Sequence, residues 1–196
     1  GAAALGEFTT QRFFTLPGRE PVPAVELQPR QGLANVAAKL KAGQNVTVAV
    51  FAGGNHAQGQ WTAAVGQWLQ AQYPATKLTV INSPIEGGFR GSGLSVFRLG
   101  HDVLSHRPDL LIVDFATDDF ESNEDAVQAN AEGMVRQAWK SNPNMDVLFV
   151  YAFRLEYEAD YAKGLCPSAV SAYERVAARY GVPAINMGQR LAQLAR

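Results

Sequence analysis

The chain has 196 residues, 47% of them hydrophobic, with 17 basic and 18 acidic side chains and a formal net charge of −1. It is therefore large enough to bury one sizeable core, and its charge balance argues against a nucleic acid or an anionic membrane surface as partner. No apolar run approaches the roughly 20 residues of a membrane span. Cys166 is alone and the three histidines form no ligand pattern, so we expect no disulfide, metal centre or cofactor.

The N-terminal region is rich in proline and glycine and shows no sustained period, which predicts an extended arm over residues 1–30. Its first residues, Gly1 to Ala4, match the small side chains left after signal-peptide cleavage. They predict a secreted or periplasmic protein, although a plain cytoplasmic N-terminus would look the same. No sequence feature indicates an oligomeric state.

From residue 31 onward, short apolar runs alternate with amphipathic segments. Strands that are apolar throughout, each followed by a helix, predict a parallel sheet covered by helices on both faces. We therefore expect a three-layer α/β/α domain over residues 31–196, with any site at the carboxyl ends of the strands. The predicted strands are 46–51, 78–81, 110–115, 147–153 and 183–186, and the predicted helices are 31–41, 60–73, 94–106, 124–140, 167–180 and 187–196.

Three short motifs follow successive predicted strands. They are Gly53-Gly54, then Gly87-Gly88 with Gly91-Ser92, and then the run from Asp114 to Asp119. Their order and spacing resemble SGNH/GDSL hydrolases, and within them the bacterial branch whose members often act as esterases on acylated carbohydrates. The resemblance runs from about Gly32 to Asn186 and implies the flavodoxin-like SGNH fold with its parallel sheet.

The resemblance also implies where catalytic groups would lie, and the sequence departs from the family at most of these positions. The family's nucleophilic serine falls on Gly54 or Asn55, neither of which carries a hydroxyl. The glycine that donates an N–H to the oxyanion falls on Gly88. The oxyanion asparagine falls on Asp118, whose carboxylate accepts hydrogen bonds and repels an anion unless it is protonated. The Asp-x-x-His that supplies the base has no counterpart before the end of the chain.

Two functions follow from these departures. The first is a catalytically degenerate SGNH/GDSL-hydrolase-like protein that binds a small or acylated carbohydrate ligand. The alternative is an active esterase or deacetylase on acylated carbohydrate, with rearranged catalytic residues or a C-terminal segment that follows this sequence. A purely structural or interaction module is a third class, for which we find no motif.

Four further residues are candidates for ligand binding, namely His56, Glu86, Arg90 and Asp119. Each has a plainer interpretation as well: His56 could cap a helix, and Asp119 could cap local backbone N–H groups. Trp61 could join Glu86 and Arg90 in rimming a sugar pocket, but we expect it to be core together with Trp68.

Two other sets of residues favour structural roles. Ser83, Ser92 and Ser95 lie near the glycine-rich turn, where serine commonly bonds the local backbone, so we do not expect a substitute nucleophile. The acidic residues Asp114, Asp118, Asp119 and Glu121 suggest a divalent cation, but the family pattern already carries acids at two of these positions. We therefore predict no metal site. We do predict that Gly54, Asn55, Gly88 and Asp118 converge at the carboxyl edge of the sheet.

Overall fold

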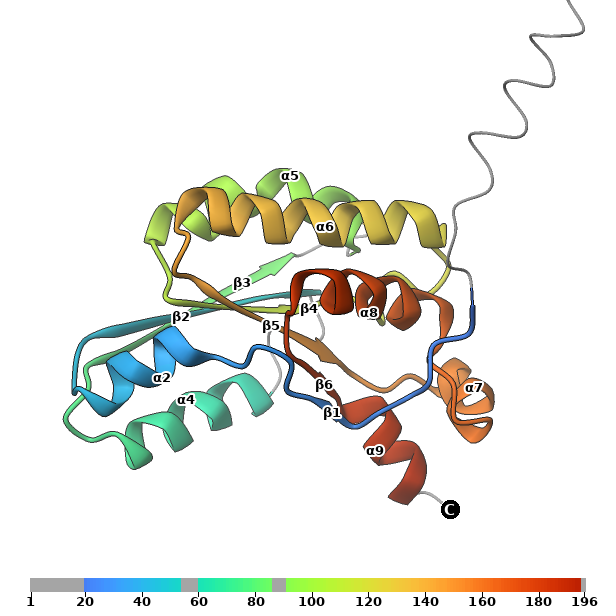
Figure 1. Ribbon diagram of the computed structural model, residues 1–196, viewed down its shortest axis with the longest axis horizontal. Coiled ribbons are helices and arrows are strands. Elements are labelled where there is room, and N and C mark those ends of the chain that lie inside the picture. Colours follow the sequence, from blue (N-terminus) through green and yellow to red (C-terminus); the bar gives the residue numbers. More distant parts are fainter. Residues whose placement is uncertain (1–19, 54–59, 86–90, 195–196) are drawn as a thin grey trace, which may run out of the picture.

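The computed structural model describes residues 20–53, 60–85 and 91–194, which form a twisted sheet between two layers of helices (Figure 1). Within these residues the sheet has six strands in the order β1-β6-β5-β4-β2-β3. All neighbours are parallel except β1, which pairs antiparallel with β6. The strands are β1 (Leu27–Gln28), β2 (Val46–Gly53), β3 (Leu78–Ile85), β4 (Leu110–Asp114), β5 (Asp146–Tyr151) and β6 (Ala184–Asn186).

The helices divide between the two faces of the sheet: α5, α6 and α8 cover one face, and α2, α4 and α9 lie on the other (Figure 1). This arrangement confirms the predicted three-layer α/β/α fold. The helices are α2 (Ala34–Lys41), α4 (Gln60–Gln72), α5 (Ser92–Asp102), α6 (Glu124–Ser141), α7 (Glu158–Ala162), α8 (Ser168–Tyr180) and α9 (Met187–Leu194). Two short 3₁₀ turns, η1 (Leu104–His106) and η2 (Leu155–Tyr157), follow α5 and precede α7.

Local signals in the sequence explain where the longer helices begin and end. The side chain of Asn123 caps α6 by accepting a hydrogen bond from the N–H of Ala126, and two acidic residues follow in the first turn. Helix α8 ends at Gly181, whose φ of 70° lies in the left-handed region that glycine adopts without strain. These ends lie within two residues of the predicted ones.

Alternating side chains of the strands build one apolar cluster on each face of the sheet. On the α5, α6 and α8 face, aromatic rings meet edge to face: Phe51 with Phe115 at 5.0 Å between centroids, and Phe149 with Tyr173 at 5.3 Å. The other face is covered less completely. An apolar hollow of about 280 Å³ remains there, with α4 side chains and Met187 of α9 in its lining. Trp68 borders it and is 59% exposed, so the expectation that Trp68 is core is wrong.

The described part of the arm, residues 20–30, lies along the last strand and α8. It contributes β1 to the sheet, and the guanidinium of Arg30 donates to Glu174 at 2.6 Å and to the carbonyl of Val182 at 2.9 Å. The hydroxyl of Tyr151 donates to the other oxygen of Glu174 at 2.8 Å. The thiol of Cys166 is buried beneath the arm, and burial raises its pKa to about 12, which keeps it protonated and unreactive.

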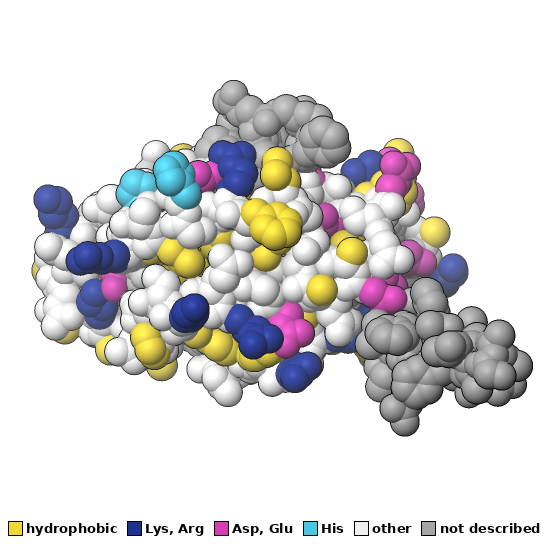
Figure 2. All heavy atoms as spheres, turned by 90° about the horizontal axis from the view of Figure 1, so that it is seen from above, with side chains coloured by type: hydrophobic (Ala, Val, Ile, Leu, Met, Phe, Trp, Pro, Cys, Tyr) yellow, Lys and Arg dark blue, Asp and Glu magenta, His cyan; other side chains and the backbone are white. Residues whose placement is uncertain are grey.

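The surface shows no separation of charge on the face that carries α5 and α6, where basic and acidic side chains are interspersed (Figure 2). Among the described residues, no helix combines the length and the apolar character needed to cross a bilayer.

The segment after β5 differs from the prediction, since η2 and α7 form where no element was expected. Their residues are half polar and too few to show a period.

Candidate functional site

The carboxyl ends of β2, β3 and β4 lie side by side, because the three strands are parallel neighbours. The register places Gly53 opposite Ile85 and Ala52 opposite Asp114. The predicted site residues follow these strand ends. Gly54, Asn55 and Gly88 lie outside the described residues, as do His56, Glu86 and Arg90, so their convergence stays a prediction.

Asp118 lies next to the strand end at which the family carries its nucleophilic serine. Its carboxylate packs directly on the backbone of Gly53: a Cβ atom on that glycine would lie 1.8 Å from Oδ2 of Asp118. Gly53 is the last residue of β2 and immediately precedes Gly54, one of the two positions that match the family's serine. A negatively charged group therefore occupies the end of the strand where the family begins its nucleophile turn.

Asp114 lies beneath Asp118 at the end of β4 and is fully buried. Neither of its oxygens accepts a hydrogen bond of good geometry from a described residue. Burial, together with the negative charge of Asp118, raises the pKa of Asp114 to about 8, and the nearby N–H of Ala152 only partly opposes this. Asp114 is therefore mainly a neutral carboxylic acid at pH 7.

Asp119 holds the loop after β4 to two helices. Its Oδ1 accepts the N–H of Ser92 at the start of α5 at 2.8 Å, and its Oδ2 accepts the hydroxyl of Tyr173 in α8 at 3.0 Å. Burial raises the pKa of Asp119, although these hydrogen bonds oppose the rise. A Cβ on Gly91 would lie 2.4 Å from Oδ1, so only glycine permits this approach. Both carboxylate oxygens of Asp119, a predicted ligand-binding residue, therefore accept hydrogen bonds from within the protein.

Two residues that the sequence interpretation missed support the same loop from the segment after β5. Arg154 donates to the carbonyl of Thr117 at 2.7 Å, and Tyr157 donates to the carbonyl of Ala116 at 2.5 Å. Arg154 also lies over the ring of Phe120, 4.3 Å from its centroid, and the charge of Asp118 helps to raise its pKa after the larger effect of Glu156. The signal that could have found them is their position, directly after a predicted strand.

The three serines near the site make structural hydrogen bonds, of which only that of Ser95 is local in sequence. Ser83 donates to the carbonyl of Asp102 at 3.0 Å, and Ser95 donates to that of Gly91 at 2.7 Å. Ser92 is fully buried and its Oγ accepts from the amide of Asn130 at 3.1 Å. Among the described residues, none of these hydroxyls is hydrogen-bonded to a histidine, and no group of three or more side chains could hold a metal ion.

Comparison with known proteins supports the fold and identifies the family. A two-domain esterase active on acetylated mannans is 29% identical, with a TM-score of 0.66, over 80% of this chain and 41% of that one. The same esterase co-crystallised with mannopentaose is 28% identical. The lipase/acylhydrolase from Enterococcus faecalis is 16% identical, with a TM-score of 0.57, over 74% and 77% of the two chains, and supports the fold alone.

This chain therefore spans less than half the length of the acetylmannan esterase that it resembles. No curated protein matches it. Residues 42–195, most of the chain, match the GDSL-like lipase/acylhydrolase family model. Together with the α/β/α fold and the acidic loop after β4, this match shows that the chain belongs to the GDSL-like lipase/acylhydrolase family.

Proposed function

We propose that this domain binds an acylated carbohydrate at the carboxyl edge of its sheet and does not hydrolyse it. The observation that carries the proposal is the carboxylate of Asp118, which lies against Gly53 where the family places the asparagine of its oxyanion hole. A developing oxyanion needs hydrogen-bond donors, and an ionised carboxylate offers none. The sequence also supplies no hydroxyl at Gly54 or Asn55.

The ligand class follows from similarity. An esterase active on acetylated mannans is 29% identical to this chain, which supports a ligand of the same chemical kind. Loss of the nucleophile removes turnover, whereas binding depends on the shape and polarity of the pocket, so binding can outlast catalysis. The rival function, an active esterase with rearranged catalytic residues, requires an activated nucleophile elsewhere.

A turnover assay separates these two functions. We expect purified protein to hydrolyse 4-nitrophenyl acetate no faster than background and to show no burst, because loss of a catalytic serine costs about 10⁶-fold in related chemistry. Replacing Gly54 or Asn55 by serine together with Asp118→Asn should restore little activity without a histidine base. Calorimetry should show that the unmodified protein binds acetylated mannooligosaccharides although it does not hydrolyse them.

A fluorophosphonate probe supplies the opposing outcome. Such probes label serines that a base activates. Stoichiometric labelling of the unmodified protein at any serine would overturn the proposal and establish the esterase. If the protein is not labelled and binds no carbohydrate, the proposed carbohydrate ligand is wrong, and only the inactive hydrolase fold remains of the proposal.

A further inference from the structure

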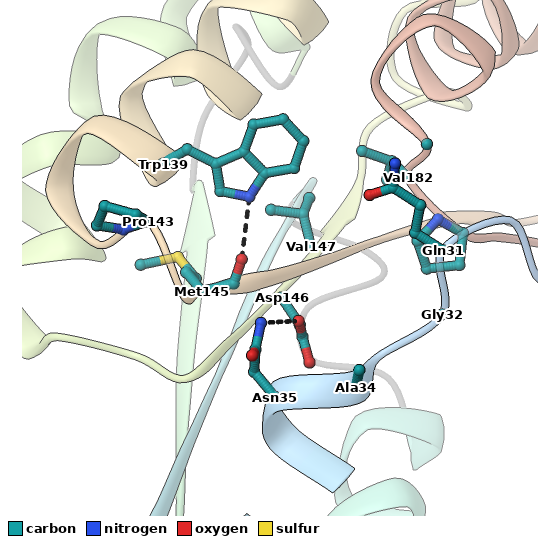
Figure 3. A pocket seen from close by; sticks show the side chains of 12 residues that line it. Gln31, Gly32, Ala34, Asn35, Trp139, Pro143, Met145, Asp146, Val147 and Val182 are labelled. Atoms are coloured by element: carbon teal, nitrogen blue, oxygen red, sulfur yellow. Dashed lines mark hydrogen bonds between the residues drawn. The ribbon is translucent and has the colours of Figure 1, made fainter. Parts of the chain in front are cut away.

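A second place suited to a ligand lies at the opposite edge of the sheet, around the amino ends of β4, β5 and β6. Two adjacent hollows of about 190 and 370 Å³ open there and share Asn35 as a wall. Ligand pockets generally have volumes of about 300–1,000 Å³, so the two together suffice for more than one sugar ring. Figure 3 shows the first hollow, with Trp139 on one side and the Asn35–Asp146 pair on the other.

The walls of the first hollow are held in place by hydrogen bonds within the protein. The indole N–H of Trp139 donates to the carbonyl of Met145 at 3.0 Å, and its ring packs against Tyr180 at 5.8 Å between centroids. The carboxylate of Asp146 accepts from the amide of Asn35 at 2.9 Å and from the N–H of Val36 at 2.8 Å. A half-buried aromatic ring and a fixed carboxylate therefore face one space, and neither loses much freedom when a ligand enters.

The second hollow adds polar groups that both donate and accept. Asn142 and Asn144 line it beside Asn35. Lys39 and Asp109, the charged residues in this wall, pair with each other at 2.6 Å. With Asp146 nearby, the two hollows carry no excess positive charge, which disfavours phosphates and nucleotides and favours a neutral ligand with many hydroxyl groups.

We propose that the paired hollows form a second carbohydrate-binding site for a neutral oligosaccharide. One sugar ring lies against the indole of Trp139, because the C–H face of a sugar is apolar, and its hydroxyls donate to the free lone pairs of Asp146. The next ring meets the amides of Asn142 and Asn144. The proposal takes its ligand class from the proposed function, but it concerns different residues at the other edge of the sheet.

Nuclear magnetic resonance with mannopentaose tests the site directly. The protein has three indole N–H groups, from Trp61, Trp68 and Trp139, which single substitutions assign. We expect mannopentaose to shift the indole signal of Trp139 and the side-chain amides of Asn142 and Asn144, while the signal of Trp68 stays still. Trp139→Ala should weaken this binding about tenfold or more, as expected for loss of a stacking ring.

Matched variants keep the test decisive. Trp68→Ala removes an exposed tryptophan elsewhere and should leave the affinity unchanged. Should Trp139→Ala fail to fold, Asn144→Ala removes an exposed amide and is expected to weaken binding several-fold. A Trp139 signal that does not move at the solubility limit of mannopentaose would overturn the proposal.

The position of the shifts distinguishes this proposal from the previous one. Shifts confined to the amides near Ser92 and Asp118 would favour ligand binding at the carboxyl edge and refute the second site. Shifts confined to Asn35, Trp139 and Asn144 would establish the second site and count against binding at the carboxyl edge. Shifts at both edges would support both.

Discussion

The surroundings of Asp114 disfavour its charge. In an unfolded chain its carboxyl would ionise near pH 4, but in the folded protein burial and Asp118 raise its pKa to about 8. Between these two pH values the folded state holds a proton that the unfolded state releases. The free energy of unfolding therefore falls as the pH rises through this range, by up to about 1.4 kcal/mol per pH unit for this one group. Asp119, whose pKa is also raised by burial, contributes in the same direction.

Asp114→Asn should remove most of this dependence. The amide has nearly the same shape and cannot ionise, so we expect the variant to gain stability relative to the native protein as the pH rises from 5 toward 8. Urea unfolding followed by circular dichroism at a series of pH values measures the effect. Glu121→Gln, which removes an exposed carboxylate from the same loop, is the control and should leave the pH dependence unchanged. Parallel curves for native protein and Asp114→Asn would show that Asp114 is ionised when folded.

The contact between Gly53 and Asp118 makes a second prediction at this scale. Gly53→Ala would place a Cβ 1.8 Å from Oδ2 of Asp118, so the Asp118 side chain must move from its position, and we expect a loss of about 1–3 kcal/mol in unfolding free energy. Gly100→Ala is the matched control, because nothing lies within 4 Å of that position in α5. It should stabilise the protein by up to about 1 kcal/mol. Equal stability of Gly53→Ala and the native protein in thermal unfolding would contradict the contact.

The residues of the site could be predicted from sequence only in part. The apolar run that precedes Asp114, Asp118 and Asp119 predicts correctly that they follow a strand, and Asp114 and Asp119 also match acidic positions of the family. Their different roles could not be predicted, since the two hydrogen bonds of Asp119 come from α5 and α8, which are distant in sequence. Arg154 and Tyr157 were missed because they belong to no motif.

At the scale of elements, the arm is attached through a nearly buried ion pair. Arg30 and Glu174 have side-chain exposures of 15% and 8%, and removal of one partner leaves a charge without compensation. We expect Arg30→Met to cost about 3 kcal/mol in urea unfolding and to increase hydrogen exchange in β1. Arg98→Met breaks a more exposed pair with Asp102 and should cost less than about 1 kcal/mol. A similar cost for the two variants would mean that the arm does not depend on this ion pair.

The strands and helices predicted from apolar runs and helical periods are present, although β3 extends to Ile85 instead of residue 81 and α5 ends at Asp102 instead of residue 106. The elements that were not predicted have a common cause. β1 has two residues and forms because it can pair with the edge of β6 that β5 does not occupy. η2 and α7 are short and are held by buried tyrosines, Tyr157 and Tyr161, rather than by a pattern of their own. Elements whose stability comes from distant partners leave little local signal.

At the scale of the whole molecule, the alternation of strands and helices was enough to predict three layers and the edge at which the family site lies. It could not predict how completely each face is covered. The apolar positions of α4 mark one side of the helix, yet Trp68 remains exposed beside the hollow that separates α4 from α9. Nor could it predict the hollows around Asn35, which form between segments that are unrelated in sequence.

The position of the arm also constrains the order of folding. The long-range backbone partners of its described residues come from residues 164–186: Ala24 bonds Gly164, Glu26 bonds Asn186, and Leu27 pairs with Ile185. A ribosome synthesises the arm before these partners, so the arm stays without its native contacts while the strands and helices between them emerge. Closure of so long a loop is slow compared with the formation of local helices. The nascent chain therefore cannot complete its sheet until β6 has emerged.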